Sequence, residues 1–112
     1  MQSQTQDVLI QYVNRIHEIY GSELKAVILY GSYARGDYTE SSDIDIMILV
    51  DSTEDTIKQK GRMVSDITFD FNLDHDIMIM PIVKNVNHFQ YWLPADPFYK
   101  NVKNDGVELY VA

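Results

Sequence analysis

The sequence predicts an α/β fold in which a small β-sheet is layered with helices. Apolar residues recur at helical spacing near the start of the chain and again after residue 52. Short runs rich in Val, Ile and Leu lie between these segments, and such runs are typical of buried strands. Helices and strands therefore alternate, which favours an α/β sheet over an all-α or all-β fold. With 112 residues, we expect one domain spanning residues 1–112.

The predicted elements follow one another with short connections. In chain order they are a helix at 4–20, strands at 24–30 and 43–50, a helix at 52–71, a strand at 76–83, helices at 88–93 and from 97 to about 106, and a strand at 107–111. No repeat, low-complexity tract or linker-like stretch interrupts them.

Apolar spacing justifies the elements of the first half. The first helix carries an apolar stripe and ends at Gly21, a residue type that commonly terminates helices. The first strand is a short apolar run that ends directly before Gly31. The polar segment after it leaves room for at most one helical turn, around residues 33–35. The second strand is continuously apolar from Ile46 to Val50, so we expect cover on both of its faces.

Capping and turn residues justify the second half. Asp51, Ser52 and Thr53 open a helix that crosses over to the third strand, so these two strands should be parallel. Pro81 in the third strand cannot donate a ladder hydrogen bond and indicates an edge, a bulge or the end of the strand. Asp96 is typical of an N-cap, because a proline follows it at the first helical position.

Composition excludes several classes of function. Nine basic and seventeen acidic residues give a formal charge of −8, which disfavours binding to a phosphate backbone. The absence of cysteine excludes disulfides, thiolate zinc sites and cysteine nucleophiles. No apolar run approaches the roughly 20 residues of a membrane helix. The first ten residues do not resemble a secretory signal, and we expect a cytoplasmic protein.

One constellation of residues carries chemistry. Gly31 and Ser32 directly follow a predicted strand, where a glycine permits close backbone approach and the following amides and hydroxyl can hold an anion. After ten further residues come Asp43 and Asp45, whose carboxylates should project from one face of a strand. Two adjacent carboxylates repel each other unless a cation lies between them, and their oxygens suit Mg²⁺. A phosphate cradle beside such a site predicts nucleoside triphosphate chemistry.

A third carboxylate could complete the site. If the third strand lies beside the second, Asp76 can reach the same face as Asp43 and Asp45. Three carboxylates could then hold two metal ions about 3.5–4 Å apart. Asp74 has the same strand parity and is the alternative, but we favour Asp76 because Ile77–Met80 continue it as a strand.

The segment GSYARGDYTESSDIDIMIL resembles the signature of the DNA polymerase β-like nucleotidyltransferase superfamily: Gly-Ser, about ten residues, then Asp-x-Asp. Within it, the small size and the ARGD stretch resemble the minimal nucleotidyltransferase (MNT) antitoxins of HEPN/MNT toxin–antitoxin pairs. The strong resemblance covers Tyr30–Leu49, and a looser one runs from Asp76 through DPFYKNVKNDGVELY. It implies the polymerase β-like fold, a small mixed β-sheet flanked by helices.

The resemblance also implies roles for individual residues. Gly31 and Ser32 would hold the β- and γ-phosphates of ATP. Asp43 and Asp45 would bind two Mg²⁺ ions. Asp76 would bind the catalytic ion and activate the acceptor hydroxyl.

Two neighbouring residues are less securely placed by the resemblance. Arg35 would contact phosphate or the partner, although an arginine here could equally form a surface ion pair. Tyr33 stands where many relatives carry arginine, so this chain departs from the family at one phosphate-contacting position.

The implied reaction transfers AMP from ATP to a hydroxyl and releases pyrophosphate. The implied acceptor is a tyrosine of a HEPN-domain toxin, which makes this chain a type VII-like antitoxin. The implied assembly is a hetero-oligomer with that toxin, or a homodimer when alone, with no membrane or nucleic-acid partner.

Several alternatives remain open. The chain could be a non-catalytic antitoxin that neutralises by binding, or an aminoglycoside-type small-molecule nucleotidyltransferase that needs a second subunit. Taken alone, Gly31-Ser32 would be a strand-ending turn, and Asp76 could be a solvated residue at the start of a strand. Five aromatic residues gather near the C-terminus, and they predict core packing or, as the second interpretation, a partner groove: Phe89, Tyr91, Trp92, Phe98 and Tyr99.

Overall fold

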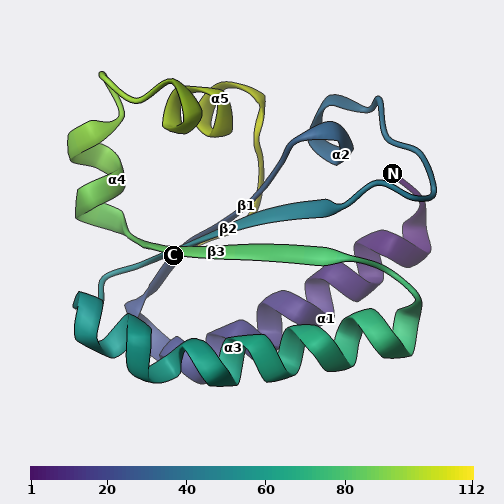
Figure 1. Cartoon of the computed structure of the whole chain (residues 1–112), viewed down its shortest axis with the longest axis horizontal. Helices are drawn as coiled ribbons and strands as arrows, with labels where there is room; N and C mark the ends of the chain where they lie inside the picture. Colours follow the sequence, from purple (N-terminus) through teal and green to yellow (C-terminus); the bar gives the residue numbers. More distant parts are fainter.

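A computed structural model describes residues 1–112, and Figure 1 shows their arrangement. The elements in chain order are α1 (Ser3–Tyr20), a 3₁₀ turn (Gly21–Glu23), β1 (Leu24–Tyr30), α2 (Ser32–Arg35), β2 (Ile44–Val50), α3 (Glu54–His75), β3 (Ile79–Asn85), α4 (Val86–Trp92), α5 (Pro97–Asp105) and β4 (Val107–Val111). The predicted α/β architecture is confirmed. No helix combines the length and the apolar character that a bilayer crossing requires.

The four strands form one mixed sheet in the order β3-β2-β1-β4. Strand β2 runs antiparallel to β1 and parallel to β3, as the crossover through α3 predicts. Strand β4 pairs antiparallel with β1 at the opposite edge. Pro81 therefore lies on an edge strand, where the sheet does not need an N–H from this residue.

Helices cover both faces of this sheet (Figure 1). On one face, α1 and α3 pack their apolar stripes against the strands in a core that includes Tyr12, Ile16, Ile46 and Val64. On the other face, α4 and α5 form a smaller core around Met47. The whole apolar run of β2 from Ile46 to Val50 is buried, which confirms the prediction of cover on both sides.

The predicted aromatic group divides between core and surface. Phe89 and Tyr99 are buried in the α4–α5 layer, as core packing predicts. Tyr91, Trp92 and Phe98 remain 75%, 47% and 40% exposed. The second interpretation, a partner groove, therefore applies only to these three.

The region around Asp76 differs from the prediction. Helix α3 continues to His75 and β3 begins at Ile79, so the predicted strand at 76–83 starts three residues too early. The side chain of Asn72 explains the longer helix, because it accepts a hydrogen bond from the Ile79 N–H at 2.7 Å and donates one to the Ile79 carbonyl at 3.2 Å. The last turn of α3 is thereby fixed to the edge strand, and Asp76 becomes its C-cap.

Candidate active site

The candidate site lies where β1 ends and β2 begins. Gly31, directly after β1, has φ 74° and ψ −153°, a conformation that is essentially restricted to glycine. The single helical turn α2 follows at once, in agreement with the prediction, because the N–H groups of Ala34 and Arg35 both donate to the Gly31 carbonyl. The chain therefore turns sharply at the Gly-Ser pair.

The connection from α2 back to the sheet is held by its own side chains. The rings of Tyr33 and Tyr38 stack at 4.2 Å between centroids with 9° between their planes. Further along, the Thr39 N–H donates to the Ser42 hydroxyl and the Ser42 N–H donates to the Thr39 carbonyl. Tyr33, which departs from the family pattern, thus has a structural role in this chain. These contacts fix the loop that precedes Asp43, which lies directly before β2.

Gly31 and Asp45 lie in direct contact. A Cβ atom added at Gly31 would collide with the Asp45 carboxylate, so only glycine leaves room for that side chain. The register of the sheet produces the contact, because Asp45 pairs with Tyr30, the residue before Gly31. The predicted phosphate-binding corner at Gly31 and one predicted metal ligand, Asp45, are therefore adjacent in space.

The two aspartates of the Asp-x-Asp motif lie close enough to interact electrically. Burial raises the pKa of Asp45 above its ordinary value, the negative charge of Asp43 raises it further, and Arg35 partly opposes both effects. Asp43 is exposed and stands one residue before β2. A carboxylate that burial and a neighbouring negative charge disfavour is suited to share a divalent cation with that neighbour, as the sequence predicts.

Arg35 contributes a positive charge that lowers the pKa of Asp45. Its Nε lies 3.4 Å from Oδ2 of Asp37, and both side chains are about half exposed or more. Arg35 therefore forms the predicted surface ion pair, and its charge also reaches Asp45, whereas the predicted contact with phosphate or the partner stays a prediction. An exposed pair of this kind is weak, so the guanidinium is available to a phosphate group.

The raised pKa of Asp45 leads to a pH prediction for the protein without metal. Because the charged carboxylate is disfavoured in the folded state, that state binds more protons than the unfolded chain between the ordinary pKa of 3.8 and the raised one. The contribution of Asp45 to stability therefore falls as pH rises through this window. We expect Asp45→Asn to raise the melting temperature near neutral pH and to leave it unchanged below pH 3.8. Parallel melting curves at all pH values would contradict this expectation.

The structure does not bring Asp76 together with the other two carboxylates. Asp76 has φ 52° and ψ 50° at the end of α3, and no three acidic or histidine side chains of the chain converge closely enough to hold a metal ion. Together with Tyr33 and Ser42, it lines a cavity of about 180 Å³ near the residues at which β2 and β3 begin. Asp74, the alternative, lies on α3 and has no strand parity. The predicted gathering of three carboxylates from neighbouring pleats is therefore not formed.

Sequence reasoning did not place two aromatic residues, Tyr30 and Phe98, beside the site. Tyr30 shares its register row with Asp45, and burial together with the charge of Asp45 raises its pKa. The Phe98 ring meets the Tyr30 ring edge to face at 5.5 Å. An antiparallel pairing of the strands flanking residues 31–43 would have indicated Tyr30, whereas no sequence signal places Phe98 there.

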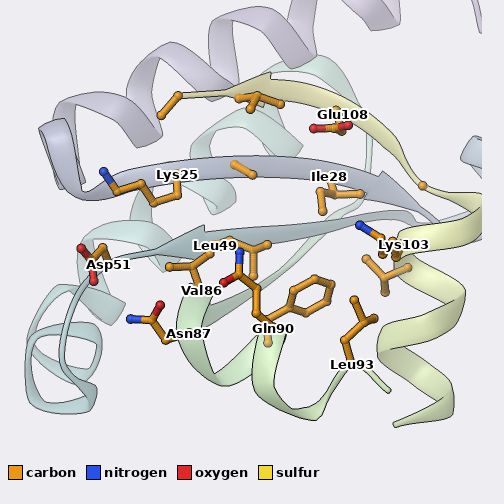
Figure 2. A pocket seen from close by; sticks show the side chains of 16 residues that line it. Lys25, Ile28, Leu49, Asp51, Val86, Asn87, Gln90, Leu93, Lys103 and Glu108 are labelled. Carbon is orange, nitrogen blue, oxygen red and sulfur yellow. The ribbon is translucent and has the colours of Figure 1, made fainter. Parts of the chain in front are cut away.

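The largest cavity, about 600 Å³, lies at the other end of the sheet. Figure 2 shows Lys25 and Asp51 near one of its ends, with Val86, Gln90 and Leu93 projecting from the α4 side. Its lining includes neither Gly31 nor either aspartate of the Asp-x-Asp motif. Size alone would therefore indicate a surface without the chemistry found at the β1–β2 junction.

A glycine corner against a carboxylate, in a mixed sheet covered by helices, is the arrangement that the resemblance of the sequence implies for a nucleotidyltransferase. The chain belongs to the polymerase beta nucleotidyltransferase family, whose model matches residues 11–110. It is thus an enzyme of nucleotidyl transfer by family and by fold.

Relatives and solved structures agree with this assignment. Two proteins of Methanocaldococcus jannaschii, both named as candidate protein adenylyltransferases, are 36% and 37% identical to this chain. The first alignment covers 92% of this chain and 96% of the relative, and the second covers 89% and 92%.

Solved structures share the fold at lower identity. A candidate nucleotidyltransferase from Sulfolobus solfataricus has a TM-score of 0.58 at 24% identity, covering 96% of this chain and 85% of that one. A toxin–antitoxin complex with AMP-PNP has a TM-score of 0.58 at 19% identity, and an MntA–HpeT toxin–antitoxin variant 0.57 at 17%. Both cover 92% of this chain and 73% of theirs.

Proposed function

We propose that this chain is an Mg²⁺-dependent adenylyltransferase that transfers AMP from ATP to a tyrosine of a HEPN-domain toxin and thereby acts as its antitoxin. The observation that carries the proposal is the contact between Gly31 and Asp45. It joins a backbone corner able to receive phosphate oxygens to a carboxylate pair that needs a cation. The names of the relatives and the toxin–antitoxin structures of the same fold support it.

Each residue of the site has a proposed task. Gly31 and Ser32 receive the β- and γ-phosphates, and Arg35 supplies a nearby positive charge. Asp43 and Asp45 hold the Mg²⁺ that accompanies the triphosphate. When bound, the ion neutralises phosphate charge and acts as a Lewis acid. The assignment of Asp76 to the acceptor hydroxyl stays a prediction, which is tested further below.

The reaction balances at the α-phosphorus. The tyrosine oxygen forms a new bond to this phosphorus while the bridging bond to the β-phosphate breaks, and pyrophosphate leaves with the bonding electron pair. The hydroxyl proton passes to solvent or to a carboxylate. If no side chain is positioned to accept this proton, the reaction lacks the 10²- to 10⁴-fold rate enhancement that a general base typically provides.

The surface of the chain suits a protein partner. Its net charge of −8 disfavours nucleic acid, and the exposed aromatics of α4 and α5 lie on the sheet face that carries Asp45. Phe98 connects the two, because it is 40% exposed and its ring contacts Tyr30 next to the site. A partner that binds there could present a tyrosine to the nucleotide.

The test is incubation of the chain with ATP, Mg²⁺ and the HEPN protein encoded beside it. We expect mass spectrometry to find one or more adenylyl groups on a toxin tyrosine and the toxin to be silenced. The double variant Asp43→Ala with Asp45→Ala should abolish both effects. If it still neutralises the toxin, the protein is instead an antitoxin that works by binding. If only a small hydroxylated compound is modified, the proposed acceptor is wrong.

A further inference from the structure

The strand beside the aspartate pair carries methionines, not a carboxylate, at the level of the site. In the parallel ladder between β2 and β3, Asp45 pairs with Met80. The pairing begins at Ile44 and Ile79, where the Ile44 N–H donates to the Met78 carbonyl at 2.7 Å, so Met78 lies directly before β3. Asp43 and Met78 each directly precede the first paired residues of the two strands, Ile44 and Ile79. A third ligand from this part of the chain would come from Met80 on β3 or from Met78 directly before it.

Alternation along β3 sets the direction of these side chains. Ile79, between them, is 1% exposed and packs into the α1–α3 core. Met80 must then project from the opposite face, which is also the face of Asp45. Met80 is 47% exposed, and Met78 is 50% exposed with its sulfur 3.9 Å from Nδ2 of Asn72 at the sheet edge. Neither position belongs to a closed apolar core.

A thioether cannot replace a carboxylate as a ligand for Mg²⁺. Magnesium is a hard cation that takes oxygen ligands, whereas the sulfur of methionine is soft and uncharged. Asp76 does not make up for this, because it caps α3 in a left-handed conformation and joins no group of three metal-binding side chains. The residues present therefore fit one divalent ion, between Asp43 and Asp45, and do not fit the two-ion site that the family resemblance implies.

We infer that this chain binds one divalent ion per nucleotide, because methionines stand where a carboxylate would hold a second ion: Met80 beside Asp45 on β3, and Met78 directly before that strand. The inference rests on the proposed function and refines its site. It implies a site that retains the nucleotide but gives little help in deprotonating the acceptor. A carboxylate introduced on β3 should supply the missing ligand.

The experiment counts bound Mn²⁺ by electron paramagnetic resonance, in the presence of a non-hydrolysable ATP analogue. We expect one nucleotide-dependent ion in the unaltered chain and still one in Asp76→Asn. Either Met78→Asp or Met80→Asp should raise the count to two and accelerate adenylyl transfer at least about tenfold. Met63→Asp is the matched control, because Met63 is 51% exposed on α3, outside the site, and should leave both values unchanged.

The possible outcomes separate this inference from the proposed function. Two ions in the unaltered chain would overturn the inference and leave the adenylyltransferase proposal standing. Two ions that become one in Asp76→Asn would assign the third carboxylate to Asp76. No nucleotide-dependent ion at all would overturn both. If neither folded methionine variant gains an ion, the β3 positions are not the missing ligand site, and circular dichroism verifies that each variant is folded.

Discussion

Asp45→Asn should reduce adenylyl transfer by about a thousandfold while the protein remains folded. The carboxylate pair is the proposed anchor of the metal, and metal stabilisation of a transition state contributes several kcal/mol. A loss of about 4 kcal/mol corresponds to roughly a thousandfold in rate. Folding should survive, because the substitution removes a partly buried charge that Asp43 repels. The measurement is the initial rate of AMP incorporation at saturating ATP and Mg²⁺.

The companion variant Asp43→Asn should behave in the same way, although Asp43 is exposed. If both aspartates hold one ion, losing either removes most of its effect, so the double variant should be barely slower than each single one. Asp70→Asn is the control, since Asp70 is an exposed aspartate on α3 outside the site. Independent, multiplicative losses would mean that the two carboxylates do not act on a common ion.

The elements that sequence reasoning placed correctly are those whose signals are local. The apolar run of β2, the proline after Asp96 and the turn after Gly31 each depend on a few consecutive residues, and the structure confirms all three. The Asp-x-Asp spacing also depends only on strand alternation, so the position of Asp45 next to the glycine corner follows from the chain itself once β1 and β2 pair.

Asp76 could not be placed in this way, because its position depends on a contact between distant elements. The segment from Asp70 to Asp76 is mostly polar and contains no glycine to end the helix. The two hydrogen bonds between Asn72 and Ile79 fix where α3 stops, and they form only when the helix lies against the edge strand. Asp76 adopts the left-handed conformation that ends the helix, which aspartate tolerates. Its residue type alone does not indicate a helix end, whereas the apolar residues after it indicate a strand.

The positions of Met78 and Met80 illustrate the same limit. Nothing in their local sequence distinguishes a methionine beside a metal site from one on any half-covered strand. Only the parallel register between β2 and β3 shows that Met80 lies next to Asp45. Register depends on the packing of the whole sheet, which is why the two-ion expectation could be questioned only with the structure in hand.

Gly31→Ala should destabilise the protein and, more specifically, weaken its affinity for nucleotide. At φ 74° and ψ −153° an alanine carries backbone strain of about 1–3 kcal/mol. Its methyl group would also collide with the Asp45 carboxylate, which must move away from the corner. We expect a loss of more than about tenfold in ATP-analogue affinity, measured by calorimetry with Mg²⁺, together with a lower midpoint of urea denaturation.

Gly21→Ala separates these two effects. Gly21 has a similar backbone conformation, φ 57° and ψ −132°, but a Cβ there would meet no atom within 4 Å, and the residue lies at the end of α1. Both alanine variants should therefore lose stability through backbone strain, with a further loss in Gly31→Ala from the collision, whereas only Gly31→Ala should lose nucleotide affinity. If Gly21→Ala weakened nucleotide binding equally, the loss would come from general destabilisation. If Gly31→Ala retained full affinity, the glycine corner would not be where the triphosphate binds, and the site proposed at the β1–β2 junction would be wrong.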